Sequence, residues 1–383
     1  MLPIEEGSVN LETLLIILNT VFAYLLIGFL WIGKSKENRG NLFLSLMILQ
    51  LSLYFLPEFL SVLGLLDDFP HAVRIYVIGS FLLGPITYFY VRTCIEKEFK
   101  VTWRMGWHFL PTILDFLYQL PFYTLPGEEK LQFFYNFFTE GFQQPPILTL
   151  VKVMHVLLYV CISIRLIFKY NVHLKDATSS IDAAFHRWLL FFCLAAILPS
   201  ISTLVYIFTT PEFAYIFLVL STFFAILTAF SLLIIKPTIF LRFPHRFDSI
   251  ELERTPKNKY VHSKLQTDQK DRFLQKLITF VEKEKSYQSP ELTLAELSQQ
   301  VDIPAHYLSQ VINEKLQVNF LDFINKYRVN AAKEKLLDPK LSHYTILAIA
   351  FEAGFNAKST FYAAFKKHTG MTPSQYRLTK KVG

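Results

Sequence analysis

Residues 345–377 read TILAIAFEAGFNAKSTFYAAFKKHTGMTPSQYR, and this stretch decides how the rest of the chain is interpreted. Apolar residues at helical spacing predict a short helix at its start, and Phe361 and Phe365, four positions apart, predict the buried face of a second helix. Between the two, Gly354 suits a left-handed turn, and Asn356 is the expected N-cap of the second helix. The pattern is typical of a helix-turn-helix, although a plain helical hairpin would look similar.

The outward face of the second helix is predicted to carry small polar and basic side chains. Residues of this kind near the start of a helix suit contacts with base edges in the major groove of DNA. Gly370 is expected to end the helix, and Thr372 and Pro373 to cap and start another. The outward positions are Lys358, Ser359, Tyr362 and Lys366.

The composition places part of this chain in a lipid bilayer. Of its 383 residues, 52% are hydrophobic, 18% are charged and 38 are Phe, and the mean hydropathy is +0.33. A water-soluble protein has no need of so much apolar surface, and the excess is confined to the first two-thirds of the chain. From residue 268 onward, 17 Lys and Arg stand against 12 Asp and Glu, which accounts for +5 of the net charge of +7. We therefore predict a membrane domain followed by a small basic domain.

Neither a metal ion nor a cofactor is expected. Cys94, Cys161 and Cys193 lie in or beside apolar stretches without the paired spacing of a zinc site or a disulfide framework, so they are interpreted as small buried apolar residues. The start of the chain is acidic and its first apolar stretch is too long for a cleavable signal, so none is expected. The sequence shows no glycine-rich phosphate loop and no nucleophile beside a base, and we expect no enzymatic activity.

Seven apolar stretches are long enough to cross a bilayer, which takes about 20 residues as a helix. The fourth is the weakest, because Pro111, Asp115, Gln119 and Pro121 interrupt it. We predict an all-α fold in which a seven-helix transmembrane domain, residues 1–235, precedes a soluble all-helical domain. The predicted spans are 11–33, 41–64, 71–95, 107–125, 147–170, 188–208 and 213–235.

Charges in the loops predict the orientation of the chain. Basic residues cluster after the first span, between the third and fourth, between the fifth and sixth, and after the seventh. The opposite loops are acidic or nearly uncharged, as at Asp67 and Asp68. Because cytoplasmic loops are enriched in Lys and Arg, the N-terminus is expected outside and the C-terminus in the cytoplasm. The chain is thus predicted to be a multi-pass protein of the inner, cytoplasmic membrane.

Four ionisable residues fall inside the predicted spans, where such groups are costly and often functional. One interpretation is an intramembrane pocket for a ligand or an ion. The other is that these groups neutralise one another or lie near the membrane interface, and both interpretations stay open. The residues are Glu58, Asp115, Lys152 and His155.

A second helix-turn-helix pattern precedes the quoted stretch. Thr293 and Glu296 have the spacing of a capping box, a turn follows at Pro304, and the next helix is expected to point His306 outward. A continuous helical pattern between the two units spans roughly 30 Å, close to the ~34 Å of one turn of DNA, so two recognition helices can enter successive major grooves. The predicted boundaries are 236–267 for a linker, 268–383 for the domain, 268–284 for its first helix, 293–316 and 345–369 for the two units, and 319–338 for the helix between them.

This domain resembles the DNA-binding domain of AraC/XylS-family transcription regulators, over about a quarter of the chain. The first unit reads LTLAELSQQVDIPAHYLSQVINEKL, the linker helix FLDFINKYRVNAAKEKL, and the second unit contains GFNAKSTFYAAFKKHTGMTPSQYR. The layout of apolar spans followed by such a domain is also similar to membrane-anchored regulators of this type. The family's signature falls on Gly354, Phe355, Ser359, Phe361, Phe365, Lys366, Gly370, Thr372, Pro373, Tyr376 and Arg377.

The resemblance implies roles for particular residues. Arg328, on the linker helix, is expected to be structural. The residues expected to read bases are His306, Ser309 and Gln310 in the first unit and Lys358, Ser359, Tyr362 and Ala363 in the second. Attraction to DNA phosphates is expected from Lys315, Lys333, Lys366 and Lys367.

Two positions depart from the family's pattern. Gln317 stands where a glycine commonly ends the first recognition helix, so a left-handed cap there would cost about 1 kcal/mol. Ala363 stands where some members carry an arginine, so direct base readout by the second helix is expected to be modest.

Together these observations predict a membrane-integral, one-component transcription regulator. Its expected partners are duplex DNA, the lipid bilayer and an envelope or small-molecule signal, and a homodimer is allowed for. One alternative is a transporter-like or receptor-like membrane protein with a cytoplasmic regulatory tail. Another is a membrane-bound enzyme of lipid chemistry, but that would need ionisable residues clustered at the cytoplasmic ends of the spans.

Overall fold

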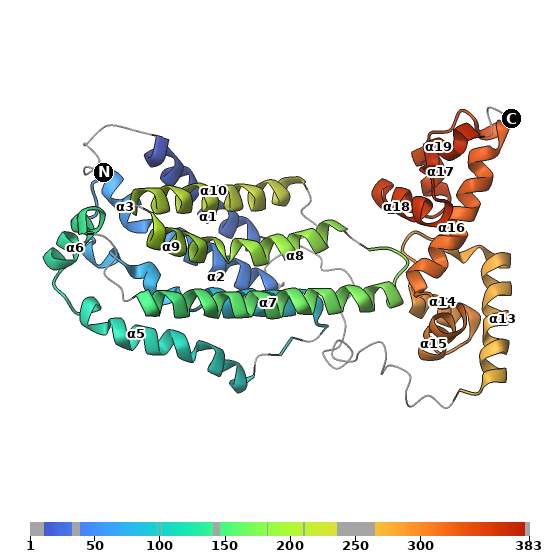
Figure 1. Ribbon diagram of the computed structural model, residues 1–383, viewed down its shortest axis with the longest axis horizontal. Helices are drawn as coiled ribbons and strands as arrows, with labels where there is room; N and C mark the ends of the chain where they lie inside the picture. The colour runs from blue at the N-terminus through green and yellow to red at the C-terminus, as the bar shows by residue number, and fades with distance from the viewer. Residues whose placement is uncertain are drawn as a thin grey trace. The chain divides into compact units, whose positions relative to one another are not determined.

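The structure of the chain, a computed structural model, describes residues 11–32, 39–97, 99–100, 102–140, 146–181, 183–209, 211–235 and 265–379. Within these ranges every assigned secondary-structure element is a helix, which confirms the all-α prediction. The chain divides into two compact units (Figure 1): an N-terminal unit of Met1–Phe168 and Ala183–Ser249, and a C-terminal unit of Lys169–Asp182 and Ile250–Gly383. Most of the predicted linker lies outside the described residues.

The N-terminal unit is built from apolar helices joined mainly by short turns. Helix α1 packs against α2 and α10, α2 against α4, and α9 against α10 (Figure 1). Its elements are α1 Leu11–Leu30, α2 Arg39–Leu53, α3 Leu56–Val62, η2 Pro70–Ala72, η3 Ile75–Gly79, α4 Leu83–Ile95, η4 Trp103–Phe109, α5 Leu110–Tyr123, α6 Gly127–Glu140, α7 Pro146–Ala177, α8 Ala183–Ala195, α9 Leu198–Phe208 and α10 Pro211–Ile235.

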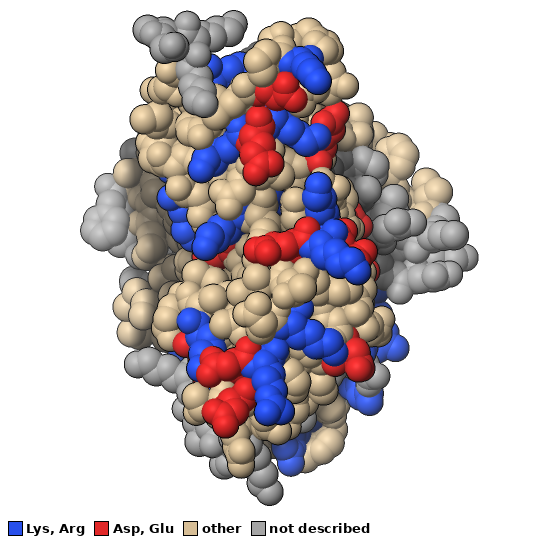
Figure 2. Space-filling view, turned by 90° about the vertical axis from the view of Figure 1, so that its right-hand side faces the viewer, with Lys and Arg blue, Asp and Glu red and all other residues tan. Residues whose placement is uncertain are grey.

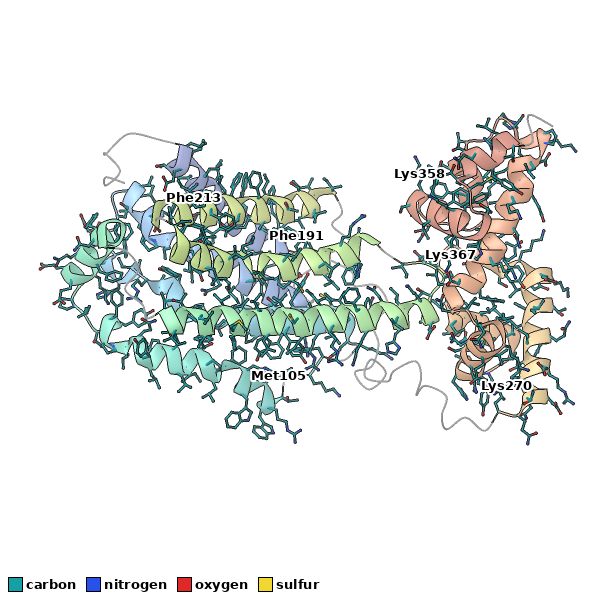
Figure 3. All side chains as sticks on the ribbon, in the orientation of Figure 1. Met105, Phe191, Phe213, Lys270, Lys358 and Lys367 are labelled. Carbon is teal, nitrogen blue, oxygen red and sulfur yellow. The ribbon has the colours of Figure 1, made fainter. Side chains whose placement is uncertain are left out.

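The surface of this unit is apolar, and polar contacts lie between its helices. Leu14 on α1, Leu158 on α7 and Phe213 on α10, the last labelled in Figure 3, are all exposed. Inside the unit, the buried Asn19 side chain donates from Nδ2 to Thr222 Oγ1 at 3.1 Å and joins α1 to α10. An apolar exterior around internal hydrogen bonds is the arrangement expected of helices surrounded by lipid.

Four helical segments are long and apolar enough to cross a membrane, and two bent helix pairs bring the number to six. The pair α2 and α3 is bent by 55°, and the pair that ends in α4 by 56°. The described residues thus give four to six candidate spans, where seven were predicted. The four segments are Leu11–Leu30, Ile147–Ala177, Ala184–Ser202 and Phe213–Ile235.

The fourth predicted span, 107–125, is not among these candidates. It folds as η4 followed by the 14-residue α5. At 1.5 Å per residue α5 is roughly 21 Å long, too short for a hydrocarbon core of about 30 Å. Without this span the number of crossings no longer supports the predicted orientation, which then rests on the loop charges alone.

The C-terminal unit contains both helix-turn-helix patterns, with α16 running between them (Figure 1). The predicted helix at 319–338 is confirmed as α16, and the predicted helix at 268–284 as α13. The unit also includes the last turns of α7, from Lys169 onward, most of which lie beyond the predicted span 147–170. Its other elements are α13 Thr267–Glu284, η6 Ser286–Gln288, α14 Leu294–Val301, α15 Ala305–Leu316, α16 Phe320–Leu337, η7 Pro339–Leu341, α17 Ile346–Glu352, α18 Lys358–Thr369 and α19 Pro373–Thr379.

Two hydrophobic clusters hold this unit together, and α16 contributes to both. The first joins α13, α14 and α15 to the start of α16 through residues such as Leu297, Leu308 and Phe323. The second joins the end of α16 to α17 and α18, where Phe361 and Phe365 are fully buried as predicted. Because α16 lies in both cores, it fixes the separation of the two helix-turn-helix units.

Helix starts in this unit mostly follow the sequence signals. The capping box is confirmed, because Thr293 Oγ1 accepts from the Glu296 amide at 3.1 Å and Glu296 Oε2 accepts from the Thr293 amide at 2.8 Å. The predicted cap of α18 is wrong. Asn356 lies one residue too early, and the N-cap is Ala357, which makes no side-chain capping bond.

Helix ends and turns take the left-handed backbone that the sequence predicts. Gly354 in the second turn has φ of 97°, and Gly370 after α18 has φ of 75°. Gln317 ends α15 with φ of 56°, so the left-handed cap forms there without a glycine. Asp302, in the turn of the first unit, has φ of 50°.

Candidate functional site

Helix α18 presents the predicted base-reading residues of the second unit to solvent. Lys358, Ser359 and Ala363 are exposed and Tyr362 is half-buried, on the side of the helix away from the buried phenylalanines. The Lys358 ammonium lies 5.6 Å from the centre of the Tyr362 ring, and Figure 3 shows Lys358 at the free start of α18. This face has the small polar and basic character of a groove-reading surface.

Helix α15 presents its predicted residues differently. His306 is exposed and its ring stacks near that of Tyr307, with 3.9 Å between centroids. Ser309 and Gln310 are each only 3% exposed. The Gln310 amide donates from Nε2 to Glu314 Oε1 at 3.0 Å. Of the three predicted readers in this unit, only His306 is presented to solvent in this structure.

The lysines expected to contact phosphates fall into two groups. Lys315 and Lys367 form ion pairs, with Asp271 at 2.6 Å and with Asp322 at 2.7 Å. Lys366 is exposed, and the Lys333 ammonium lies 5.9 Å from the Tyr376 ring centre.

Acidic side chains accompany the basic ones elsewhere on the C-terminal unit. On the face drawn in Figure 2, Lys and Arg alternate with Asp and Glu. Further ion pairs join Lys270 to Glu314 and Lys335 to Glu352. The basic character of this unit is therefore spread over paired lysines and is not gathered into one uniform patch on that face.

Arg328 is structural, as expected. It is 1% exposed, and its guanidinium donates from Nε to the Tyr287 carbonyl and from Nη2 to the Ser289 carbonyl, both at 2.7 Å. Burial lowers the pKa of Arg328 to about 10. The group keeps its charge at neutral pH, and the surrounding carbonyl oxygens offset part of the loss of water.

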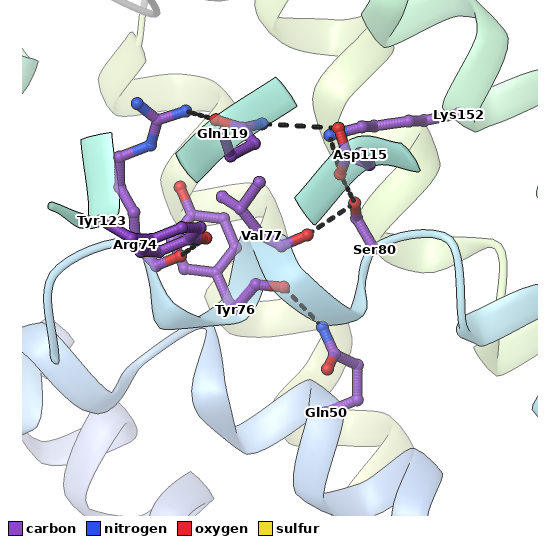
Figure 4. A network of polar contacts seen from close by, with 9 residues as sticks. All are labelled: Gln50, Arg74, Tyr76, Val77, Ser80, Asp115, Gln119, Tyr123 and Lys152. Carbon is purple, nitrogen blue, oxygen red and sulfur yellow. Dashed lines mark hydrogen bonds and ion pairs between the residues drawn. The ribbon is translucent and has the colours of Figure 1, made fainter. Parts of the chain in front are cut away.

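A network of polar side chains lies inside the N-terminal unit (Figure 4). The Lys152 ammonium lies 2.9 Å from Asp115 Oδ2, and both side chains are largely buried. Longer contacts extend from the carboxylate, to Ser80 Oγ at 3.4 Å and to Gln119 Nε2 at 3.5 Å. Arg74 Nη2 donates to Gln119 Oε1 at 3.0 Å and completes the chain of contacts.

The structure brings together part of the predicted intramembrane set. Asp115 and Lys152 form an ion pair, which is the mutual neutralisation that the sequence left open. His155 stacks edge-on to Phe81 at 5.0 Å, and the Lys152 ammonium lies 5.6 Å from the same ring. Within the described part of the chain, Glu58 on α3 forms no hydrogen bond or ion pair with these three groups.

Sequence reasoning missed Arg74, Ser80 and Gln119 as members of this network. Arg74 is a charged residue inside the predicted span 71–95, and that alone could have marked it. Its guanidinium stacks over Phe122 at 4.5 Å and Phe133 at 4.9 Å. Ser80 carried no comparable signal, because a serine in an apolar helix usually bonds to its own backbone.

The C-terminal unit matches a known family of domains. The helix-turn-helix domain family matches residues 297–379, which span α14 to α19. With the two units, the helix between them and the signature residues in place, the AraC/XylS-type helix-turn-helix domain predicted for this region is confirmed.

Particular relatives are similar to part of the chain. The melibiose operon regulatory protein of Escherichia coli (strain K12) is 35% identical over 86 residues, which are 22% of this chain and 28% of that protein. An uncharacterised HTH-type transcriptional regulator of Staphylococcus aureus (strain MSSA476) is 39% identical over 87 residues, which are 23% of this chain and 11% of that protein. The match therefore spans 28% and 11% of the length of these relatives. Both are named as regulators, in agreement with the expectation that the chain is not an enzyme.

One solved structure is also similar to part of the chain. It is a protein of unknown function from Listeria innocua, 34% identical, and the match covers 28% of this chain and 95% of that one with a TM-score of 0.25.

Proposed function

We propose that the chain is a membrane-integral transcription regulator whose C-terminal unit binds promoter DNA. The observation that carries the proposal is the pair of 12-residue helices α15 and α18, held at the two ends of the 18-residue α16. At 1.5 Å per residue α16 is roughly 27 Å long, which suits two recognition helices in successive major grooves. The names of the relatives as regulators, and the apolar helices of the N-terminal unit, support the same function.

The proposed division of labour gives α18 the larger share of sequence readout. Lys358, Ser359, Tyr362 and Ala363 meet bases in one groove, and His306 meets them in the other. Ser309 and Gln310 join only when they become exposed. Lys333 and Lys366 attract phosphates directly, whereas Lys315 and Lys367 first exchange an aspartate for a phosphate.

The proposed location is the cytoplasmic membrane, with the C-terminal unit in the cytoplasm where the chromosome lies. The distribution of Lys and Arg in the loops supports this orientation. The N-terminal unit then senses an envelope or small-molecule signal, and the network around Asp115 and Lys152 is the proposed sensing site because ionisable groups inside a membrane are commonly functional. A homodimer on a repeated DNA site fits this proposal as well.

The test is capture of DNA by the full chain purified in lipid nanodiscs. Sheared genomic DNA of the source organism is passed over the protein, and retained fragments are sequenced. We expect a few promoter fragments to be enriched. If none is retained above the level seen with empty nanodiscs, the regulator proposal is wrong.

Two lysine variants then test the division of labour. Lys358→Ala is expected to change the preference among retained sequences by about tenfold, because it removes a contact to bases. Lys367→Ala is expected to weaken all sequences alike, and Lys340→Ala, which removes an exposed lysine from η7, serves as a control for charge. Equal losses for all sequences in both Lys358→Ala and Lys367→Ala would contradict the roles proposed here.

A receptor-like or transporter-like protein with a regulatory tail is the second candidate. The buried Asp115–Lys152 pair favours it, since such pairs also line the pathways of transported ions. Proteoliposome uptake assays with Asp115→Asn as the control separate the two functions. Uptake that the variant abolishes, without DNA capture by the native chain, would favour the second candidate.

A further inference from the structure

The turn that follows α7 is built into the C-terminal unit. We call residues 178–180 the strap. Thr178 and Ser179 are 2% and 0% exposed. The Ser179 amide donates to the Leu292 carbonyl at 3.0 Å, and Thr178 forms an antiparallel bridge with Thr293. Thr293 is the N-cap of α14, so a short piece of β-pairing joins the strap to the first residue of the first helix-turn-helix unit.

Arg328 binds the strap from the other side. Its Nη1 donates to the Ser179 carbonyl at 2.7 Å, and its Nη2 donates to Ser179 Oγ at 2.8 Å. The same guanidinium holds the Tyr287 and Ser289 carbonyls, which lie just before the first unit. The charged, fully buried guanidinium is shared between these acceptors. If one acceptor is lost, the buried charge is less well solvated, so the hydrogen bonds of Arg328 depend on one another.

The second helix-turn-helix unit meets the same residue. The guanidinium carbon of Arg328 lies 5.8 Å from the centre of the Phe355 ring, in the turn between α17 and α18. Next to it, the backbone of Gly354 is so close to Tyr287 that an added Cβ would stand 2.4 Å from the Tyr287 carbonyl oxygen. The strap, the start of the first unit and the turn of the second unit therefore all pack around Arg328.

Helix α7 connects this meeting point to the membrane. It is one uninterrupted helix of 32 residues, and most of it forms a candidate membrane span. At 1.5 Å per residue it is roughly 48 Å long, about 18 Å more than a bilayer core of ~30 Å, so its last turns extend beyond the lipid. A continuous helix moves largely as a rigid rod, and a shift or rotation at one end appears at the other.

We propose that the strap is a docking segment through which movement of α7 is passed to Arg328 and from there to both helix-turn-helix units. The inference rests on the proposed function for its consequence, a change in DNA binding. The docking itself is independent of that function. A docking segment of this kind needs only a short extended stretch whose backbone carbonyl and amide can form hydrogen bonds. The hydroxyl of Ser179 adds a second acceptor for the Arg328 guanidinium.

Hydrogen exchange of the full chain in nanodiscs tests the docking. Ser179→Pro removes the amide that bonds to Leu292 and the hydroxyl that bonds to Arg328. We expect backbone amides of residues 287–297 to exchange about tenfold faster in this variant, because their local opening becomes easier. Ser180→Ala, which leaves the Ser179 bonds in place, is the matched control and should exchange like the native chain.

Two further measurements keep this test decisive. Exchange in the middle of α18 reports whether the unit remains folded, and it should not change in Ser179→Pro. Ser179→Ala removes only the hydroxyl and is expected to give a smaller increase than Ser179→Pro. If residues 287–297 exchange at the native rate in Ser179→Pro, the strap is not a docking segment.

The transmission of movement is tested without knowledge of the signal. One alanine inserted after Phe168 turns the last part of α7 by about 100°. With a reporter driven by a captured promoter, we expect the insertion to change output about fivefold in the native background and hardly at all with Ser179→Pro, because the coupling is broken. Equal effects in both backgrounds, including no effect, would overturn transmission through the strap. Failure to capture any promoter would instead defeat the proposed function, and the exchange experiment would still decide the docking.

Discussion

Helices α15 and α18 have the same length and the same place in their helix-turn-helix units, but they present different surfaces. Each has 12 residues and ends in a left-handed residue. On α18 the serine in the predicted reading face, Ser359, is exposed. On α15 the serine in the predicted reading face, Ser309, lies three positions further along its helix and is 3% exposed. Two serines that the sequence assigns to reading faces therefore differ in their access to solvent.

The two helix-turn-helix units also differ in the residues that form their turns. The second turn depends on Gly354, whose φ of 97° and close backbone contact leave no room for a side chain. The first turn uses Asp302 at φ of 50°, a conformation that a short polar side chain tolerates. The second unit is thus more tightly specified by its residues, and it is also the unit that presents its reading face to solvent.

The largest expected effect tests the turn of the second unit. Gly354→Ala should destabilise the C-terminal unit by about 3 kcal/mol, because a left-handed backbone strains an alanine and its Cβ meets a carbonyl oxygen. Gly370→Ala is the control, since φ is also positive there but the space is open, and it should cost about 1 kcal/mol. Urea unfolding followed by circular dichroism measures both changes. Equal losses would show that the close contact at Gly354 has no influence.

A matched pair of serines tests the difference in access. Ser359→Ala should weaken DNA binding about fivefold and leave stability unchanged, because the residue is exposed on the reading face. Ser309→Ala should leave DNA binding nearly unchanged and alter stability, because the residue is buried. Gel-shift titration measures the DNA affinity of both variants, and urea unfolding measures their stability. Equal losses of DNA affinity would mean that α15 and α18 present their faces alike.

Substitutions at the ends of α15 and α18 should have smaller effects on stability, of opposite sign to each other. Gln317→Gly should stabilise the C-terminal unit by about 1 kcal/mol, because glycine adopts the left-handed cap of α15 without strain. The Gln317 side chain donates to the Glu314 carbonyl at 2.7 Å, and its loss reduces the gain. Gly370→Gln at the end of α18 should cost a similar amount. Thermal unfolding of the two variants checks both signs, and a destabilised Gln317→Gly would show that the hydrogen bond outweighs the strain.

The smallest effect concerns how α15 is attached to α13. Burial raises the pKa of Glu314, but hydrogen bonds from Lys270 and Gln310 and the Lys270 charge outweigh burial and lower it below its usual value. A lowered carboxyl pKa means that the native state binds its proton more weakly, so the stabilisation is present above the usual pKa and disappears as the pH falls through the lowered one. Because the pair is partly exposed, we expect only a few tenths of a kcal/mol. The acid limb of the stability curve should flatten slightly in Glu314→Gln, and an unchanged limb would contradict this.

Most of the C-terminal unit could be predicted from sequence because its signals are local. The capping box at Thr293, the glycines at 354 and 370 and the paired phenylalanines each act within a few residues, and all of them appear in the structure. The cap at Asn356 was missed by one residue, which is the usual error at a helix end. The interrupted apolar stretch at 107–125 includes the short helix α5 and is not among the candidate spans.

The rest could not be predicted because it depends on residues far apart in the chain. Arg328 and Ser179 are separated by 149 positions, and nothing near Ser179 marks it as a partner. The burial of Ser309 and Gln310 likewise follows from tertiary packing and not from helical periodicity. The pairing of Asp115 with Lys152 likewise joins residues of two different helices.

The ion pairs on the C-terminal unit have a consequence for the thermodynamics of DNA binding. Lys270, Lys315, Lys335 and Lys367 each face a carboxylate of the same unit. When a phosphate takes the place of such a carboxylate, part of the cation release that drives binding is offset by the cations that the freed carboxylate attracts. The slope of log affinity against log salt, about 0.9 per neutralised phosphate for unpaired lysines, should therefore count fewer charges than the lysines that touch the DNA. The protein would then hold its promoters with less sensitivity to changes in cytoplasmic salt than its basic residues suggest.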